Sequence, residues 1–126
     1  MPDARHVYEV QSPRLNEWSV AGDWTIGGES AILNSKGGSI AYRFHARDLH
    51  LVLGPGPSDA PVHFRVTIDG MPPGDSHGAD TAVDGTGVVD RQRLYQLVRQ
   101  GGAVNDHTFM IEFLDPSVQA FAFTFG

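Results

Sequence analysis

Hydrophobic and polar residues alternate along much of this chain. Between residues 62 and 69 the even positions are apolar and the odd positions are polar. Residues 40–45 and 49–53 largely repeat the pattern, and a break rich in Gly, Pro or Asp follows each segment. A period of two places every second side chain on one face of a strand. The pattern therefore predicts half-buried strands joined by turns.

The last twenty residues, His107 to Gly126, carry the most apolar face of the chain. We expect a strand, a break at Asp115–Ser117 and a second strand. Burying each phenylalanine of these strands would contribute very roughly 1.5–3 kcal/mol before entropy costs. One face of the first strand is predicted to hold Phe109, Ile111 and Phe113, and one face of the second Phe121, Phe123 and Phe125, with Ala120, Ala122 and Thr124 opposite.

Short apolar runs predict further strands in the first third of the chain. A break at Ala21–Gly22 is expected to separate two of them. The runs lie at Val7–Val10, Glu17–Val20, Asp23–Ile26 and Ala31–Leu33.

Two later segments are less regular. Residues 74–88 are polar, rich in Gly and Asp and without periodicity, which predicts a long surface loop. Asp90–Gln100 fits either a helix or a strand. We favour the strand, because the neighbouring segments are strands and Gly101–Gly102 is typical of a hairpin turn. The total of about nine short strands predicts an all-β protein, a β-sandwich.

Composition narrows the classes of function. We expect a single domain over residues 1–126, and the 15 glycines and 8 prolines suit strands and turns. The net charge of −6 argues against nucleic acid and against an anionic membrane surface as partners. No stretch approaches the ~20 apolar residues of a membrane span, and the N-terminus lacks a signal-peptide pattern. Since there is no cysteine, disulfides and cysteine-based metal sites are excluded.

Sequence signatures of enzymes are missing. The chain contains no Gly-x-Ser-x-Gly elbow, no P-loop and no Gly-x-Gly-x-x-Gly fingerprint. Its four glutamates do not pair as an acid–base couple would. We therefore expect a non-catalytic protein that needs no cofactor.

Metal binding also has weak support. His45, His50 and His63 could converge on a metal from separate strands, but we favour solvent-facing histidines. The loop from Asp80 to Gly87 partly matches a calcium-binding loop, with Ala82 at a position that requires an oxygen ligand. A turn rich in Gly and Asp is the favoured interpretation, and we expect no metal.

Aromatic residues are the remaining lead toward a ligand. Flat amphipathic rings can stack on sugars, assisted by hydrogen bonds from charged or polar side chains to hydroxyls. Trp24 and Tyr42 fit the core better than a site. The candidate ligand-binding residues are Trp18, Arg65, His77, Asp80 and Tyr95.

Several segments together resemble one family over nearly the whole chain. The family is the C-terminal domain of DipZ-type proteins and related thioredoxin-fused redox proteins. The matching segments are Trp18, Gly22–Trp24, Tyr42–Pro55, Val62–Gly74, His77–Gly78, Arg93–Gln100 and Ala120–Gly126.

The resemblance implies a galactose-binding-like jelly-roll sandwich described as a carbohydrate-binding module. It implies further that the module ends a longer, membrane-anchored protein, outside the cytoplasm. There it follows a thioredoxin-like domain attached to an electron-transfer domain of the CcdA type. The family's loop often has an Asp-x-Asp-x-Asp-Gly pattern, from which Ala82 departs.

These observations predict a carbohydrate-binding module that positions a thioredoxin-like redox domain at glycan or cell-wall material. The alternative is a protein-interaction domain that docks the thioredoxin-like domain or an exported client. An exposed apolar patch would favour the alternative.

Overall fold

The computed structural model describes residues 4–8, 18–26, 31–55, 60–100 and 106–125. Antiparallel strands build nearly all of it, and the helical content of this part is one short 3-10 turn, η1 (Gly74–Ser76). No helix of the described residues is long and apolar enough to cross a membrane. The strands are β1 (Ala4–Tyr8), β2 (Trp18–Ile26), β3 (Ala31–Leu33), β4 (Ser39–Phe44), β5 (Asp48–Gly54), β6 (Val62–Ile68), β7 (Thr86–Val89), β8 (Arg93–Arg99), β9 (His107–Phe113) and β10 (Gln119–Phe125).

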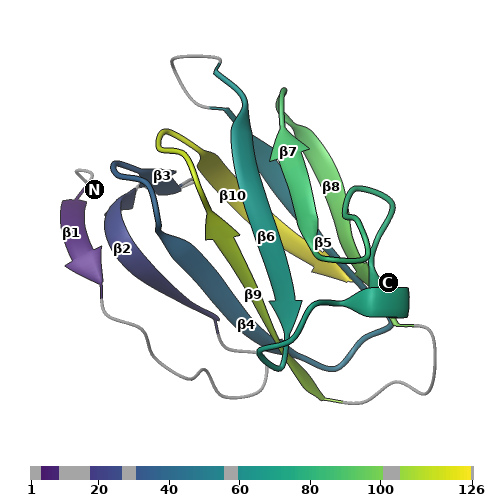
Figure 1. Cartoon of the computed structure of the whole chain (residues 1–126). Helices are drawn as coiled ribbons and strands as arrows, with labels where there is room; N and C mark the ends of the chain where they lie inside the picture. Colours follow the sequence, from purple (N-terminus) through teal and green to yellow (C-terminus); the bar gives the residue numbers. More distant parts are fainter. Residues whose placement is uncertain (1–3, 9–17, 27–30, 56–59, 101–105, 126) are drawn as a thin grey trace.

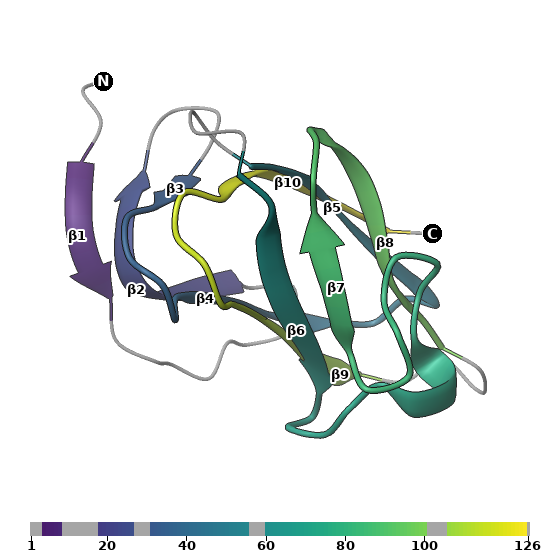
Figure 2. The same cartoon turned by 45° about the horizontal axis from the view of Figure 1, so that its top comes forward.

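The strands form two antiparallel layers that share β2 (Figures 1 and 2). In one layer β2 pairs with β4, followed by β9, β6 and β7. In the other, β2 pairs with β1 and β3, followed by β10, β5 and β8. The predicted β-sandwich is confirmed.

A bend at Gly22 lets β2 serve both layers. Residues up to Ala21 pair with β4, and residues from Gly22 pair with β1 and β3. Gly22 has a φ of +106°, and a Cβ there would lie 2.8 Å from the Cα of Gly38. Only glycine tolerates both conditions. The predicted break at Ala21–Gly22 is therefore wrong, because the glycine bends one continuous strand.

The core lies between the two layers and is rich in aromatic side chains. The predicted alternation in β6 is confirmed, with Val62, Phe64 and Val66 buried and His63 and Arg65 exposed. The largest fully buried side chains are Trp24, Tyr95, Phe44, Phe64, Phe109 and Phe113.

The end of the chain departs from the predicted alternation. The pairing of β10 with β5 shifts register between Ala120 and Ala122, which is a β-bulge or a similar irregularity. Ala120 is buried and Phe121 is only half-buried, the reverse of the prediction. An extra residue in one strand reverses which of the following side chains point toward the core. The structure describes the backbone of Phe123 and Phe125 but not their side chains.

Two predictions about the middle of the chain have different outcomes. Asp90–Gln100 contains β8 and is a strand, as favoured; the predicted turn at Gly101–Gly102 lies outside the described residues. Residues 74–88 are not wholly a loop, because β7 begins at Thr86 and pairs with β6. Only Val88 and Val89 hint at this strand in the sequence.

Truncating Phe64 tests the importance of the aromatic core. Phe64→Ala removes a fully buried ring and leaves a cavity, so we expect the free energy of unfolding to fall by about 3–5 kcal/mol. Urea denaturation followed by tryptophan fluorescence measures it. Val88→Ala, on the exposed face of the paired strand β7, is the control and should change stability by less than about 0.5 kcal/mol. Equal effects of the two variants would contradict this packing.

Candidate functional site

The loop before β7 covers the edge of β8 (Figures 1 and 2). His77 forms a β-bridge with Val98, and the Gly78 amide donates to the Leu97 carbonyl at 3.1 Å. The Asp80 amide donates to the Gln96 carbonyl at 3.0 Å. An edge strand otherwise presents unpaired backbone groups. The loop therefore extends the sheet by a short irregular strand.

Gly78 and Thr81 make this close approach possible. A Cβ on Gly78 would lie 2.2 Å from the Gln96 carbonyl oxygen, so a larger residue would push the loop away from β8. The buried Thr81 hydroxyl accepts from the Gly78 amide at 2.8 Å and donates to the Leu97 carbonyl at 3.0 Å. The first contact fixes the conformation of the loop, and the second holds the loop against β8.

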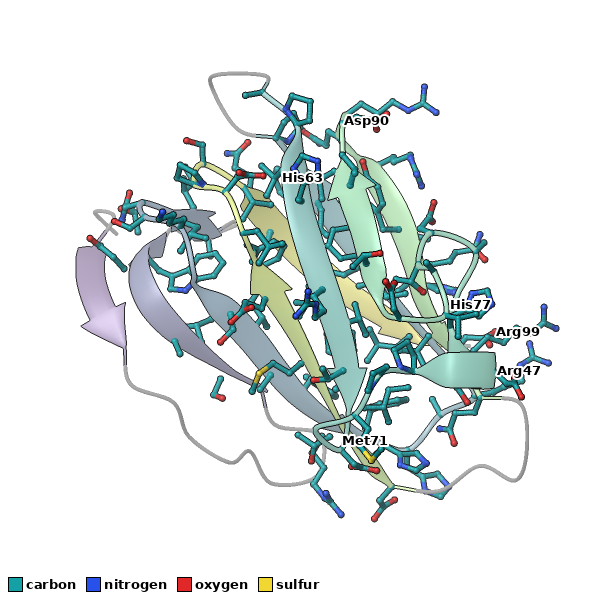
Figure 3. All side chains as sticks on the ribbon, in the orientation of Figure 1. Arg47, His63, Met71, His77, Asp90 and Arg99 are labelled. Atoms are coloured by element: carbon teal, nitrogen blue, oxygen red, sulfur yellow. The ribbon has the colours of Figure 1, made fainter. Side chains whose placement is uncertain are left out.

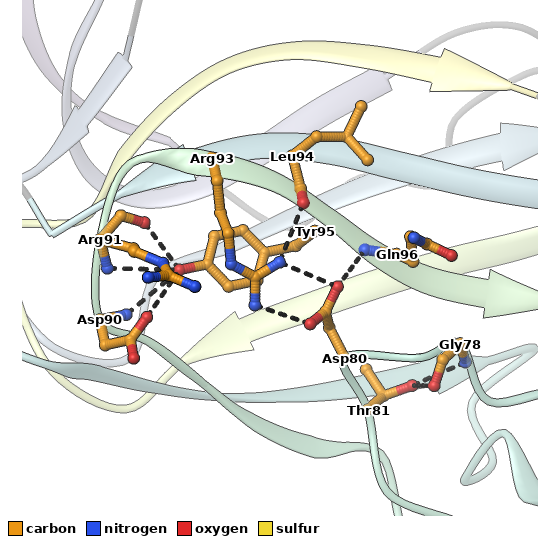
Figure 4. A network of polar contacts seen from close by, with 9 residues as sticks. All are labelled: Gly78, Asp80, Thr81, Asp90, Arg91, Arg93, Leu94, Tyr95 and Gln96. Atoms are coloured by element: carbon orange, nitrogen blue, oxygen red, sulfur yellow. Dashed lines mark hydrogen bonds and ion pairs between the residues drawn. The ribbon is translucent and has the colours of Figure 1, made fainter.

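Asp80 provides the charged part of the attachment (Figure 4). Its carboxylate accepts from two nitrogens of Arg93, at 2.7 and 3.1 Å, and from the Gln96 amide at 2.7 Å. Partial burial acts to raise the pKa of Asp80, but the hydrogen bonds from Arg93 and Gln96 outweigh it and hold the pKa below its usual value. The ionised carboxylate thus ties the loop to two points of β8.

Tyr95 lies beneath Arg93 and belongs to the core. The guanidinium carbon of Arg93 is 3.9 Å from the ring centroid, a cation–π geometry. The Tyr95 hydroxyl donates to the Arg91 carbonyl at 2.7 Å and accepts from the Asp90 amide at 3.2 Å. Because the ring is fully buried, it offers no stacking face to a sugar, and the prediction of Tyr95 as a ligand platform is corrected.

A pocket of about 320 Å³ opens beside the loop. Arg47, His77 and Arg99 lie at the same corner of the molecule (Figure 3). We call this cavity the β5–β8 pocket, because the loop covers side chains from both strands there. It is lined by Arg47, Asp48, His50, His77, Gly78, Ala79, Gln96, Val98 and Arg99.

Charged side chains surround this pocket. The Asp48 carboxylate accepts from Nε and one terminal nitrogen of Arg47, at 3.1 and 3.0 Å. The hydrogen bonds from Arg47, helped by the charges of Arg99 and His50, hold the pKa of Asp48 below its usual value although burial opposes them. Nδ1 of His77 lies 3.0 Å from the Gly78 carbonyl and so donates to it, which leaves Nε2 for other contacts.

The structure separates the predicted site residues. His77 lines the β5–β8 pocket, and Asp80 fixes the loop that carries His77. Arg65 is exposed on β6, where it is the Cα partner of Thr86 on β7 and of Glu112 on β9, and it does not line this pocket. Trp18 begins β2, but its side chain is not among those that the structure describes.

The sequence did not identify most residues that line the pocket as candidate ligand contacts. They come from two segments 46–52 residues apart in sequence, which the strand register brings together. Asp48 is the Cα partner of Arg99, and His50 is that of Gln96. The only local signal of a site was that most of them occupy polar positions of alternating segments. This does not distinguish them from ordinary solvent-facing residues of a strand. Register between distant strands could not be read from one sequence.

Comparison with known proteins adds a family and a fold. The profile of the family described as the thioredoxin like C-terminal domain matches residues 1–126. No curated protein matches the chain.

Solved structures with the same fold share little sequence with this chain. A family two carbohydrate esterase from Cellvibrio japonicus aligns with a TM-score of 0.61 and 13% identity over 97% of this chain and 33% of the esterase. The corresponding esterase from Clostridium thermocellum, in complex with cellohexaose, gives 0.58 and 16% over 79% and 28%. The chain thus spans about a third of the length of these esterases.

A third match is comparable in size. The module CsCBM6-3 from Clostridium stercorarium, in complex with cellobiose, aligns with a TM-score of 0.52 and 14% identity over 93% of this chain and 98% of the module. The galactose-binding-like jelly roll predicted from the sequence is confirmed as the fold.

Removing the Asp80 carboxylate tests the attachment of the loop. Asp80→Asn loses the ion pair with Arg93, so we expect the free energy of unfolding at pH 7 to fall by about 1–3 kcal/mol. The folded-state pKa is lowered, so this contribution is complete above the unfolded pKa of about 3.9 and is lost as the pH falls through the folded value. Urea unfolding from pH 7 to pH 2.5 should show the variant's deficit shrinking below pH 4.

Asp75→Asn is the matched control, because Asp75 is an exposed carboxylate of the same loop. It should stay close to the parent chain at every pH. A deficit of Asp80→Asn that persists unchanged at pH 2.5 would contradict the ionic attachment.

Proposed function

The chain belongs to the thioredoxin-like C-terminal domain family, and we propose that it is a non-catalytic carbohydrate-binding module with its site in the β5–β8 pocket. The observation that carries the proposal is this polar pocket, built by two strands and a loop held rigidly on β8. A pocket held on fixed strands loses little entropy when a ligand binds.

The pocket chemistry suits sugar hydroxyls, each of which donates and accepts hydrogen bonds. Arg47 and Arg99 provide donors, Asp48 provides acceptors, and the Gln96 amide provides both. The volume of about 320 Å³ lies at the lower end of the range for small-molecule pockets. Support also comes from CsCBM6-3, a protein of the same fold that is described in complex with cellobiose.

The wider setting is part of the proposal. This single domain is the C-terminal module of a longer protein outside the cytoplasm, and it positions a fused thioredoxin-like redox domain at glycan or cell-wall material. The family description and the resemblance to DipZ-type proteins support this arrangement. Trp18 and Arg65 remain candidate ligand contacts outside the pocket.

Calorimetric titration with soluble glucan and cell-wall oligosaccharides tests the binding. Sugar sites of this kind exchange water hydrogen bonds for protein ones, so we expect dissociation constants in the millimolar range. His77→Ala and Gln96→Ala each remove a pocket side chain and should weaken binding about 5–10-fold, equivalent to about 1–1.4 kcal/mol. Undetectable binding of every oligosaccharide at millimolar concentration would refute the proposed function.

Two control variants locate the site. Gln92→Ala, an exposed glutamine outside the pocket lining, should bind like the parent chain. Arg65→Ala removes the predicted contact on β6. Loss of binding in Arg65→Ala with full binding in His77→Ala would move the site from the pocket to the face of β6.

A second candidate function is docking of the thioredoxin-like domain or an exported client. Met71 and Val83 are exposed apolar side chains near the same loop, and the Gly74 amide donates to the Val83 carbonyl at 3.0 Å. Exposed apolar side chains favour protein contacts. Co-purification with the thioredoxin-like domain supplied as a separate chain, lost in the double variant Met71→Ser with Val83→Ser, would support docking.

A further inference from the structure

The β5–β8 pocket carries positive charge on a chain that is negative as a whole. Two guanidinium groups, of Arg47 and Arg99, face a single pocket carboxylate, Asp48. With neutral histidines the lining therefore has a net charge of +1, whereas the whole chain has −6. Charges beyond about 8 Å are largely screened at physiological salt, so a ligand in the pocket responds mainly to the lining.

The two arginines are not equally engaged. Arg47 meets both oxygens of Asp48 at hydrogen-bond distance. Arg99 approaches Asp48 only to 4.0 Å, which is an ion-pair contact without a hydrogen bond. Its side chain is 68% exposed, against 14% for Asp48. The donor fork of Arg99 is thus directed to solvent at the rim of the pocket.

Asp80, the other carboxylate near the pocket, does not balance the remaining positive charge of the two arginines. Asp80 is occupied by Arg93 and by the Gln96 amide. His50 contributes positive charge toward both Asp48 and Asp80 when it is protonated, since it helps lower the pKa of each carboxyl. Among the described residues that line the pocket, Asp48 is the only acid.

We propose that the ligand of this pocket is an acidic carbohydrate, whose sugar carboxylate binds the guanidinium of Arg99. This deepens the proposed function and rests on it. A planar guanidinium matches a carboxylate through two parallel hydrogen bonds, which a hydroxyl cannot reproduce. Gln96, directly opposite His50 on the neighbouring strand, and His77 then contact the ring hydroxyls.

A matched pair of ligands tests the carboxylate directly. The probes are a β-1,4-linked glucose tetrasaccharide and the corresponding tetrasaccharide of glucuronic acid, which differ only at the sixth carbon of each sugar. Calorimetry should give at least tenfold tighter binding of the acidic probe to the parent chain. Arg99→Gln should remove most of this preference, because it should weaken binding of the acidic probe far more than binding of the neutral probe: glutamine still offers a donor to hydroxyls but no charge to a carboxylate.

Two further variants complete the test. Arg99→Lys keeps the charge without the planar fork and should show an intermediate preference. Arg91→Gln, an exposed arginine on the turn between β7 and β8, should behave like the parent chain. Measuring the unfolding midpoints of all three variants verifies that they are folded. We expect them to fold, because the substituted side chains are exposed.

The outcomes separate this inference from the proposed function. Equal or weaker binding of the acidic probe would overturn the inference and leave sugar binding intact. A preference that survives in Arg99→Gln would also overturn it, because the carboxylate would then bind elsewhere. Binding of neither probe, nor of any other oligosaccharide, would remove the proposed function together with the inference.

Discussion

The pairing of the loop from His77 to Asp80 with the edge of β8 determines the shape of the candidate functional site. Without it β8 would be an open edge, with backbone groups available to other chains. With it, the loop forms one wall of a pocket, and β5 and β8 form the other. Gly78 permits the contact by having no side chain, and Asp80 secures it by charge.

The same attachment explains why a core residue and a site residue belong to one network. Arg93 holds Asp80 on one side and covers the ring of Tyr95 on the other. The buried Tyr95 anchors the start of β8 by bonding the turn before it. Rigid core packing is thereby transmitted to the loop that carries His77, so the pocket is preorganised by the sandwich itself.

Much of the fold was predictable from sequence because alternation records which face of a strand is buried. The segments of β6, β5 and β9 behaved as predicted, since each is a regular strand with one face in the core. The predictions of a break at Gly22 and of an inward-facing Phe121 were wrong for the same reason. A glycine bend and a register shift alter the direction of a strand without interrupting it, and neither changes the local pattern enough to be recognised. Of the candidate site, His77 and Asp80 were found through the polar loop, whereas Arg47, His50 and Arg99 required the register of two strands that are distant in sequence.

The proposed function requires that carbohydrate binds in the β5–β8 pocket. The most direct measurement is a titration followed by two-dimensional amide NMR, which reports the binding surface residue by residue. We expect oligosaccharide to shift the amide signals of residues 47–50, 77–79 and 96–99 and to leave those of the exposed face of β6 unchanged. Shifts confined to β6 and β7, or to the loop bearing Met71, would contradict it.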